Sequence, residues 1–259
     1  MEKRSRMNNN HPRFLILSGD GINCERETSK AFELAGASPE IVHINDLLAQ
    51  PSVLKQFQGM ALPGGFSFGD ELGSGQVLAL KIRYGLSEEF QSFIAEKKPM
   101  IGICNGFQVL VKLGLLPDPN HMRTASLMQN KEGSFINCWV PLRKITNTVC
   151  KWTQKISDSP FELPIRHGEG RIVFLASQEN VIYERLQKQG QIPLIYEKNV
   201  NGSFQSIAAL CDPTGLIFGL MPHPEAYVFE ATSRHFRTDV FQKGPGQLIF
   251  ESIVSYLHE

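Results

Sequence analysis

The residues best suited to chemistry are centred on Cys104, which has a glycine two residues before it and another two residues after it. The preceding segment, Pro-Met-Ile-Gly-Ile, is typical of a buried strand, and the following one, Phe-Gln-Val-Leu-Val-Lys-Leu, is typical of a helix. This pattern predicts a nucleophile elbow, a tight strand-to-helix turn that lifts the nucleophile above the sheet edge. The helix N-terminus favours the thiolate, the form that attacks carbonyl groups. We therefore expect Cys104 to be a nucleophile rather than a buried structural cysteine.

A base for this thiol follows much later, in the sequence Met-Pro-His-Pro-Glu at residues 221–225. The two prolines restrict the backbone around His223 and keep it out of a regular strand ladder. We expect His223 to deprotonate Cys104 and then to protonate the leaving group. Glu225 would orient the imidazole through its other nitrogen, which completes a Cys-His-Glu triad.

Two glycine-containing segments are candidates for substrate contacts. Gly64 and Gly65 follow an apolar run, and without a Cβ their backbone can approach a ligand closely. The N–H groups of Gly65 and Asn105 are expected to form an oxyanion hole for a tetrahedral intermediate. Residues 166–170, Arg-His-Gly-Glu-Gly, fit a solvated loop and a substrate-binding loop equally well.

The elements that must position these residues alternate between strand and helix patterns. Apolar runs predict strands at residues 14–17, 41–44, 59–62 and 99–103, and helical patterns occupy residues 25–34, 46–57 and 75–97. Such alternation predicts a largely parallel sheet flanked by helices, an α/β fold. Ligand sites of these sheets lie beyond the carboxyl ends of the strands. Three segments are expected there: residues 19–25, residues 63–75 and the Cys104 elbow.

The second half of the chain has a different pattern. Residues 122–174 contain extended stretches with few long helices, which predicts an additional antiparallel β portion, either an insertion or an extension of the sheet. The turn sequence Asp-Pro-Thr-Gly at 212–215 joins apolar runs at 206–211 and 216–221 and so predicts a β-hairpin. An amphipathic helix is expected over residues 247–257.

Composition excludes several classes of function. The chain has 259 residues, of which 42% are hydrophobic and 20% charged, and its 26 Lys and Arg balance 26 Asp and Glu. No net field draws it to nucleic acid or to a membrane surface. Residues 1–12 form a polar tail that we expect to be disordered and that lacks a signal-peptide core, so we expect a cytoplasmic protein. The five cysteines show no Cys-x-x-Cys spacing, and no metal site is expected.

Three segments taken in order carry a family resemblance: Gly64-Gly65, Gly-Ile-Cys-Asn-Gly-Phe-Gln at 102–108 and Pro-His-Pro-Glu at 222–225. The chain resembles the class I (triad) glutamine amidotransferases. Further motifs, at 63–70, 113–117, 167–170 and 201–203, are similar to those of the glutaminase subunits of phosphoribosylformylglycinamidine synthases. The resemblance implies a flavodoxin-like α/β fold and a single amidotransferase domain over residues 13–259.

The resemblance also implies a reaction and its participants. Cys104 would attack the side-chain amide of L-glutamine, release ammonia and form a γ-glutamyl thioester that water then hydrolyses. Gln108, His167, Gly168 and Glu169 would hold the amino-acid end of glutamine. No cofactor is implied for this chain, since ATP and magnesium would bind a partner synthetase subunit that converts formylglycinamide ribonucleotide to its amidine. A small accessory subunit is a further implied partner.

The chain departs from the family pattern away from the triad. Ala226 and Gly73 stand where an arginine is common, residues 227–244 are longer and more charged, and the N-terminal tail is extra. These positions lie where a partner subunit would bind. The alternatives are a triad amidotransferase serving another synthetase, a cysteine hydrolase or chaperone with a Gly-x-Cys elbow, and a non-catalytic protein with a decayed site. The second class lacks a late Pro-His-Pro-Glu, and the intact triad argues against the third.

Overall fold

The computed structural model describes residues 11–119, 123–235 and 242–259. Among these residues, six strands form the central sheet in the order β10-β11-β4-β3-β1-β2. The pairs β1–β2, β1–β3, β3–β4 and β4–β11 are parallel, while β10, at one edge, runs antiparallel to β11. The strands are β1 (Arg13–Ser18), β2 (Ser38–His43), β3 (Gly59–Leu62), β4 (Met100–Ile103), β10 (Ala209–Cys211) and β11 (Ile217–Leu220). The predicted α/β fold with a largely parallel sheet is confirmed.

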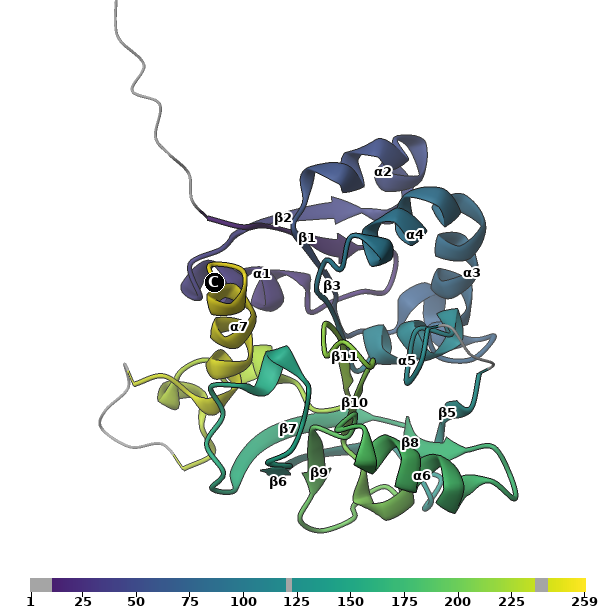
Figure 1. The fold of residues 1–259 in the computed structure, drawn as a ribbon, viewed down its shortest axis with the longest axis vertical. Coiled ribbons are helices and arrows are strands. Elements are labelled where there is room, and N and C mark those ends of the chain that lie inside the picture. The colour runs from purple at the N-terminus through teal and green to yellow at the C-terminus, as the bar shows by residue number, and fades with distance from the viewer. Residues whose placement is uncertain (1–10, 120–122, 236–241) are drawn as a thin grey trace, which may run out of the picture.

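Helices cover both faces of this sheet (Figure 1). On one side lie α1 (Glu25–Leu34) and α7 (Pro245–Tyr256), and on the other lie α3 (Gln76–Gly85), α4 (Ser87–Ala95) and α5 (Asn105–Leu113). Because both faces are covered, the central strands β3, β4 and β11 are buried along their whole length. Their sequences are accordingly continuous apolar runs rather than alternating ones.

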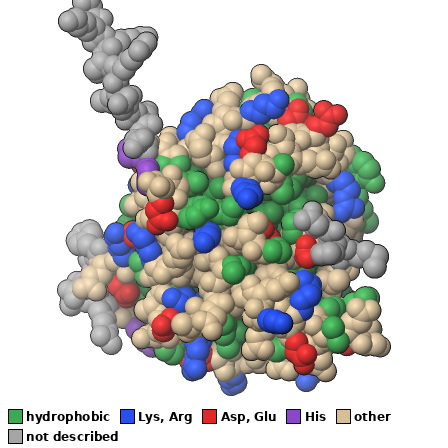
Figure 2. Space-filling view, in the orientation of Figure 1, with side chains coloured by type: hydrophobic (Ala, Val, Ile, Leu, Met, Phe, Trp, Pro, Cys, Tyr) green, Lys and Arg blue, Asp and Glu red, His purple; other side chains and the backbone are tan. Residues whose placement is uncertain are grey.

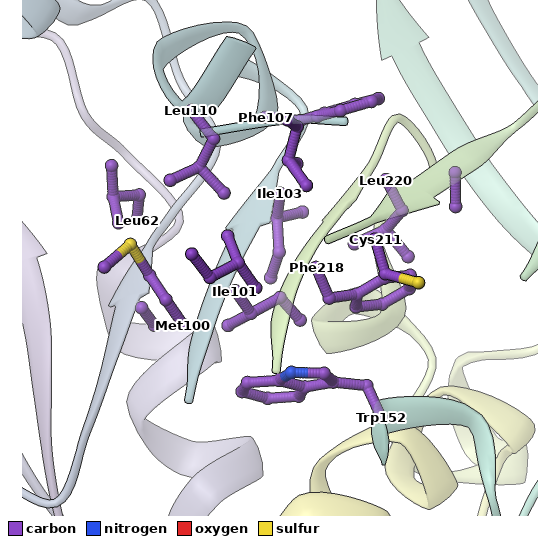
Figure 3. Packing of buried hydrophobic residues seen from close by; sticks show 14 of the residues in the cluster. Leu62, Met100, Ile101, Ile103, Phe107, Leu110, Trp152, Cys211, Phe218 and Leu220 are labelled. Atoms are coloured by element: carbon purple, nitrogen blue, oxygen red, sulfur yellow. The ribbon is translucent and has the colours of Figure 1, made fainter. Parts of the chain in front are cut away.

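The apolar core lies between the central strands β3, β4 and β11 and the side chains packed on them, including Phe107 and Trp152 (Figure 3). Phe107 of α5 packs against Gly219 of β11, where a Cβ would lie 2.0 Å from the ring of Phe107. Trp152 stacks near Phe218 with 6.3 Å between ring centroids, and its indole N–H donates to the Leu216 carbonyl at 2.8 Å. This packing fixes β11, the strand that leads to His223, against β4, the strand that leads to Cys104.

The predicted antiparallel β portion is also confirmed. Its ladders are β5–β8 and β7-β6-β9, which lie beside the main sheet rather than extending it (Figure 1). The strands are β5 (Ala125–Gln129), β6 (Ile136–Lys144), β7 (Phe161–His167), β8 (Glu169–Phe174) and β9 (Leu194–Tyr196). The turn between β7 and β8 carries the Gly168 segment, so this portion of the chain positions the loop at residues 166–170.

Two of the expected helices are wrong in extent. The pattern over residues 46–57 is divided into α2 (Ile44–Ala49) and a 3₁₀ helix (Pro51–Gln56), because the residue before a proline is disfavoured in helical geometry. The pattern over residues 75–97 breaks at Leu86 into α3 and α4. Gly85 lies there against Leu48 of α2, where a Cβ would meet the Leu48 side chain at 2.1 Å, so tertiary packing sets the break.

Smaller differences concern element limits. The strand expected at residues 41–44 runs over Ser38–His43, and Ile44 begins α2. Helix α6 (Glu179–Lys188) and strand β9 were not predicted. The expected hairpin forms as β10 and β11, and the C-terminal helix forms as α7.

The tail prediction for residues 1–12 falls outside the described residues except for His11 and Pro12, so it stays a prediction. In the described part of the chain, no helix combines the length and hydropathy that a membrane span needs. On the face shown in Figure 2, basic and acidic side chains are interspersed.

Candidate active site

Cys104 forms the strained turn between β4 and α5. Its backbone has φ 50° and ψ −104°, a conformation that a non-glycine residue adopts at a cost of roughly 1–3 kcal/mol. The surrounding structure holds it there, since its N–H donates to the Leu220 carbonyl at 2.8 Å. The predicted elbow is therefore the local geometry at Cys104.

The glycines around Cys104 are required by close packing. A Cβ on Gly106 would lie 1.8 Å from the carbonyl oxygen of Leu62, and a Cβ on Gly102 would lie 2.6 Å from the backbone of Gly106. Helix α5 thus begins directly against the ends of β3 and β4. This contact explains the spacing of the two glycines that the sequence shows.

His223 and Glu225 form a buried pair beyond the end of β11. The Nδ1–H of His223 donates to Oε1 of Glu225 at 2.6 Å, and the two side chains are 4% and 2% exposed. Burial alone lowers the pKa of His223, but the Glu225 carboxylate and the Cys104 thiol outweigh it and raise this pKa well above its ordinary value. With Nδ1 committed to Glu225, Nε2 is the nitrogen available for proton transfer.

The structure brings the nucleophile and the base to one place. Gly64 lies between them, since a Cβ there would be 2.8 Å from Cε1 of His223 and 3.5 Å from Cβ of Cys104. The Sγ of Cys104 is 3.6 Å from the Arg166 carbonyl oxygen, while Nε2 of His223 has no partner among the described residues. In enzymes without substrate such contacts are often loose and tighten on binding.

The two residues expected to form an oxyanion hole flank this place. Asn105 opens α5, where backbone N–H groups have no intrahelical acceptor. Gly65 has φ 148°, and its neighbours are fixed by hydrogen bonds from Phe66 N–H to the Gly21 carbonyl and from Cys24 N–H to the Gly64 carbonyl. Their role in stabilising an oxyanion stays a prediction.

A chain of side chains connects the loop after Gly65 to the loop after β7. The Nδ2 of Asn105 donates to Oδ1 of Asp70 at 3.2 Å and to Oε1 of Gln108 at 3.0 Å. The Nε2 of Gln108 donates to the Glu169 carbonyl at 2.5 Å. Gln108, expected to hold glutamine, therefore links α5 to β8 in this structure. Asp70 belongs to a motif that the sequence marked but to which it assigned no role.

His167 is buried and anchored by Asn130. Its Nδ1–H donates to Oδ1 of Asn130 at 3.0 Å, and Nδ2 of Asn130 donates to the His167 carbonyl at 2.8 Å. Burial lowers the pKa of His167 to about 4, with a further contribution from His223, so the imidazole is neutral near pH 7. The expected contact of His167 with glutamine stays a prediction. Sequence reasoning missed Asn130, because its partners are far away in the chain.

Gly168 and Glu169, the other expected glutamine contacts, form the half-buried turn from β7 into β8. The Asn201 side chain donates to the Gly170 carbonyl at 2.9 Å, and the Ile172 N–H donates to the Ser203 hydroxyl at 3.0 Å. The Asn-Gly-Ser motif at 201–203 thus anchors the turn and the start of β8 through these hydrogen bonds.

The positions that depart from the family pattern are not themselves triad residues, although Ala226 directly follows Glu225. Gly73 has φ 98°, and Ala226 ends the short 3₁₀ helix that contains Glu225. In the segment 227–244, Arg234 forms an ion pair with Glu162 of β7. Residues 236–241 of that segment lie outside the described part of the chain.

Cys24 is a further member of the site. It lies in segment 19–25, which the sequence places beyond the carboxyl end of the first strand without assigning a role to this thiol. Its Sγ, a ring nitrogen of His223 and a carboxylate oxygen of Glu225 all lie within 4.8 Å of one another. No local pattern predicts its contact with His223, since the two residues lie near opposite ends of the chain.

A cysteine on a strand-to-helix elbow, facing a buried His-Glu pair at the carboxyl edge of a parallel sheet, defines the class I amidotransferase architecture. The chain belongs to the CobB/CobQ-like glutamine amidotransferase family, whose domain model matches residues 11–257.

Individual relatives show which kind of glutamine amidotransferase the chain is similar to. The phosphoribosylformylglycinamidine synthase subunit PurQ of Dehalococcoides mccartyi is 42% identical over 254 residues, which cover 95% of this chain and 97% of that protein. The subunit of the same name from Methanococcus maripaludis strain S2 is 39% identical over 241 residues, covering 87% of this chain and 86% of that protein. A chain in the structure of PurLQS from Thermotoga maritima matches with a TM-score of 0.76 and 33% identity, covering 95% of this chain and 99% of that chain. The resemblance predicted from the motifs is confirmed.

Proposed function

We propose that this chain is the glutaminase subunit of a phosphoribosylformylglycinamidine synthase. It hydrolyses L-glutamine to glutamate and ammonia and supplies the ammonia to an ATP-dependent synthetase subunit, which converts formylglycinamide ribonucleotide to formylglycinamidine ribonucleotide in purine biosynthesis. The observation that carries the proposal is Cys104 on its strained elbow beside the buried His223–Glu225 pair. The similarity to PurQ proteins supports the choice of synthetase.

The chemistry follows from the placement of these groups. Cys104 Sγ attacks the side-chain amide carbon of glutamine, and the developing oxyanion accepts hydrogen bonds from the N–H groups of Gly65 and Asn105. His223, protonated by the thiol, gives its proton to the departing ammonia. A γ-glutamyl thioester remains on Cys104. Water, deprotonated by His223, then attacks this thioester and releases glutamate and the free thiol.

Glutamine specificity is assigned to the loop that crosses the site from the β7–β8 turn. His167, Gly168 and Glu169, with Gln108 of α5, form the side of the site opposite the His223–Glu225 pair in our proposal. The buried anchors Asn130 and Asn201 hold this loop in one conformation. A fixed loop positions the amino-acid end of the substrate so that its amide carbon reaches Cys104.

The synthetase partner, the small accessory subunit and a cytoplasmic location belong to the same proposal. ATP and magnesium are assigned to the synthetase, and this chain needs no cofactor for the steps above. Because ammonia released into solvent is lost to the synthetase, the glutaminase is expected to turn over slowly alone and faster in the complex.

The test is an assay of the purified chain with and without its synthetase. Glutamate release should be slow for the chain alone and should rise when the synthetase, ATP and formylglycinamide ribonucleotide are added. Glutamine should then support amidine formation, and Cys104→Ala should abolish this while added ammonia still supports it. Glutamine-dependent amidine formation by Cys104→Ala would contradict the proposal. Glutaminase activity that couples only to a different synthetase would assign the chain to another triad amidotransferase.

A further inference from the structure

Cys24 lies beside the triad but has no part in the proposed reaction. It is the N-cap residue of α1, and its backbone N–H donates to the Gly64 carbonyl at 3.3 Å. Gly64 in turn lies against the His223 ring. The Sγ of Cys24, a ring nitrogen of His223 and a carboxylate oxygen of Glu225 are mutually within 4.8 Å. A thiol, an imidazole and a carboxylate therefore converge on one point.

These three groups are the ligand types of zinc. In a tetrahedral zinc site, neighbouring ligand atoms lie roughly 3.3–3.8 Å apart. Side-chain rotations that shorten the distances between the three ligand atoms by about 1 Å would therefore give zinc-binding geometry. Two buried polar atoms here have no partner among the described residues, Nε2 of His223 and Oε2 of Glu225. Cys24 is half-buried, so an ion can reach the group from solvent.

We propose that Cys24, His223 and Glu225 form a binding site for a zinc-like divalent cation that inhibits the glutaminase. Coordination through Nε2 of His223 removes the base, and coordination through Nδ1 breaks the hydrogen bond to Glu225 that orients it. Either way Cys104 loses its proton acceptor. The three residues are far apart in the chain, which is why cysteine spacing gives no sign of the site.

The thiol must lose its proton to bind the ion. Burial raises the pKa of Cys24 above its ordinary value, while the neighbouring His223 imidazole opposes the rise. Binding of the cation therefore displaces the Cys24 proton to solvent, forms the metal–sulfur bond, and leaves no group oxidised or reduced. The site is distinct from a structural zinc site because the same side chains serve catalysis when the ion is absent.

Cobalt binding tests the ligand set without any turnover. Co²⁺ is titrated into the full chain, and the thiolate-to-cobalt absorption band in the near ultraviolet is recorded. The wild type, Cys104→Ala and the exposed-thiol control Cys138→Ser should show the band, and Cys24→Ser and Cys24→Ala should lack it. Thermal unfolding establishes that both Cys24 variants are folded. A band retained without Cys24, or lost only without Cys104, overturns the proposal.

Inhibition is tested separately in the complex with the synthetase. Zn²⁺ should inhibit wild-type and Cys138→Ser glutaminase reversibly, with recovery on adding a chelator. Cys24→Ser should need at least about tenfold more Zn²⁺ for the same inhibition. Equal sensitivity of Cys24→Ser and Cys138→Ser to Zn²⁺ contradicts the proposal. The inhibition experiment rests on the proposed glutaminase function, whereas the cobalt experiment does not, so failure of one is distinguishable from failure of the other.

Discussion

The neighbours of His223 raise its pKa, and this has opposite effects on the stability of the fold and on the rate of catalysis. Glu225, helped by the Cys104 thiol, raises the pKa of His223 against the lowering effect of burial. A base with a raised folded-state pKa adds stability below its unfolded pKa, and this contribution disappears as the pH rises through the folded value. Catalysis needs the proton to leave, so the rate should rise over the range in which that stability is lost.

Replacing Glu225 with glutamine tests this charge coupling. Without the carboxylate, the protonated His223 imidazole is less stable, so the pKa of the Cys104–His223 pair should fall. The ascending limb of kcat/KM against pH should therefore move to lower pH. The maximum kcat should fall by about 10²–10⁴, because the imidazole loses its orienting partner. The measurement is a pH profile of glutamine hydrolysis in the complex. A limb at the wild-type pH would show that Glu225 does not set the protonation state of the pair.

The pKa of His167 gives a second prediction at the residue scale, in which stability is lost as the pH falls rather than as it rises. Its folded pKa is about 4, lowered by burial, so the unfolded chain takes up a proton that the folded chain excludes. Stability should therefore decline as the pH falls from about 6.5 towards 4, by about 2 kcal/mol at pH 5 from this group. Urea unfolding at pH 7 and pH 5 should show a smaller decline for His167→Gln. An identical decline in both proteins would refute the assignment.

At the scale of elements, the elbow depends on the close approach of α5 to β3. A Cβ on Gly106 would lie 1.8 Å from the Leu62 carbonyl oxygen, so Gly106→Ala must push the helix away. We expect a loss of about 1–3 kcal/mol in unfolding free energy together with at least a tenfold loss of kcat, since both Cys104 and Asn105 move. Urea unfolding and glutaminase assays measure the two effects.

Gly114→Ala, at the other end of the same helix, is the matched control. Gly114 has φ 80° but nothing within 4 Å of a Cβ, so the variant should lose about 1–2 kcal/mol and keep its kcat. If the two variants lose activity equally, packing of the elbow is not what positions the nucleophile.

Sequence reasoning succeeded for elements whose pattern is local. The helix at Glu25–Leu34 and the strand at Gly59–Leu62 have the predicted limits, because glycines and polar residues bound each of them. The break at Leu86 was missed because it arises from packing of Gly85 on Leu48. At the site, the meeting of Cys104, His223 and Glu225 was predictable from motifs that follow strand ends, while their catalytic roles stay predictions. The contacts of Asn130 and Cys24 were not predictable, since their partners lie in distant segments.

At the scale of the molecule, the loop at residues 66–75 connects the surface to the site. Leu72 is 73% exposed, and Asp70 in the same loop accepts hydrogen bonds from Asn105 and Gly75. The ring centroids of Phe66, at the start of this loop, and Phe135 are 6.3 Å apart, and both residues are about half exposed. We therefore expect a partner that binds the exposed side chains of Phe66, Leu72 and Phe135 to act on Asn105 through Asp70.

Leu72→Asp should consequently reduce stimulation of the glutaminase by the synthetase by about tenfold and leave the rate of the chain alone unchanged. Val181→Asp, on α6 and 69% exposed, is the control and should keep full stimulation. The measurement is glutamate release with increasing synthetase. Full stimulation of Leu72→Asp would remove this loop from the docking surface.

The central claim, that Cys104 is the nucleophile of a glutaminase, is tested most directly by covalent trapping. The chain is incubated with a glutamine analogue that carries an electrophile at the amide position, and each of its five cysteines is then examined by peptide mass spectrometry. The account predicts one adduct, on Cys104, that excess glutamine prevents and that His223→Ala slows strongly. An adduct on Cys24 that forms while Cys104 stays free would contradict it.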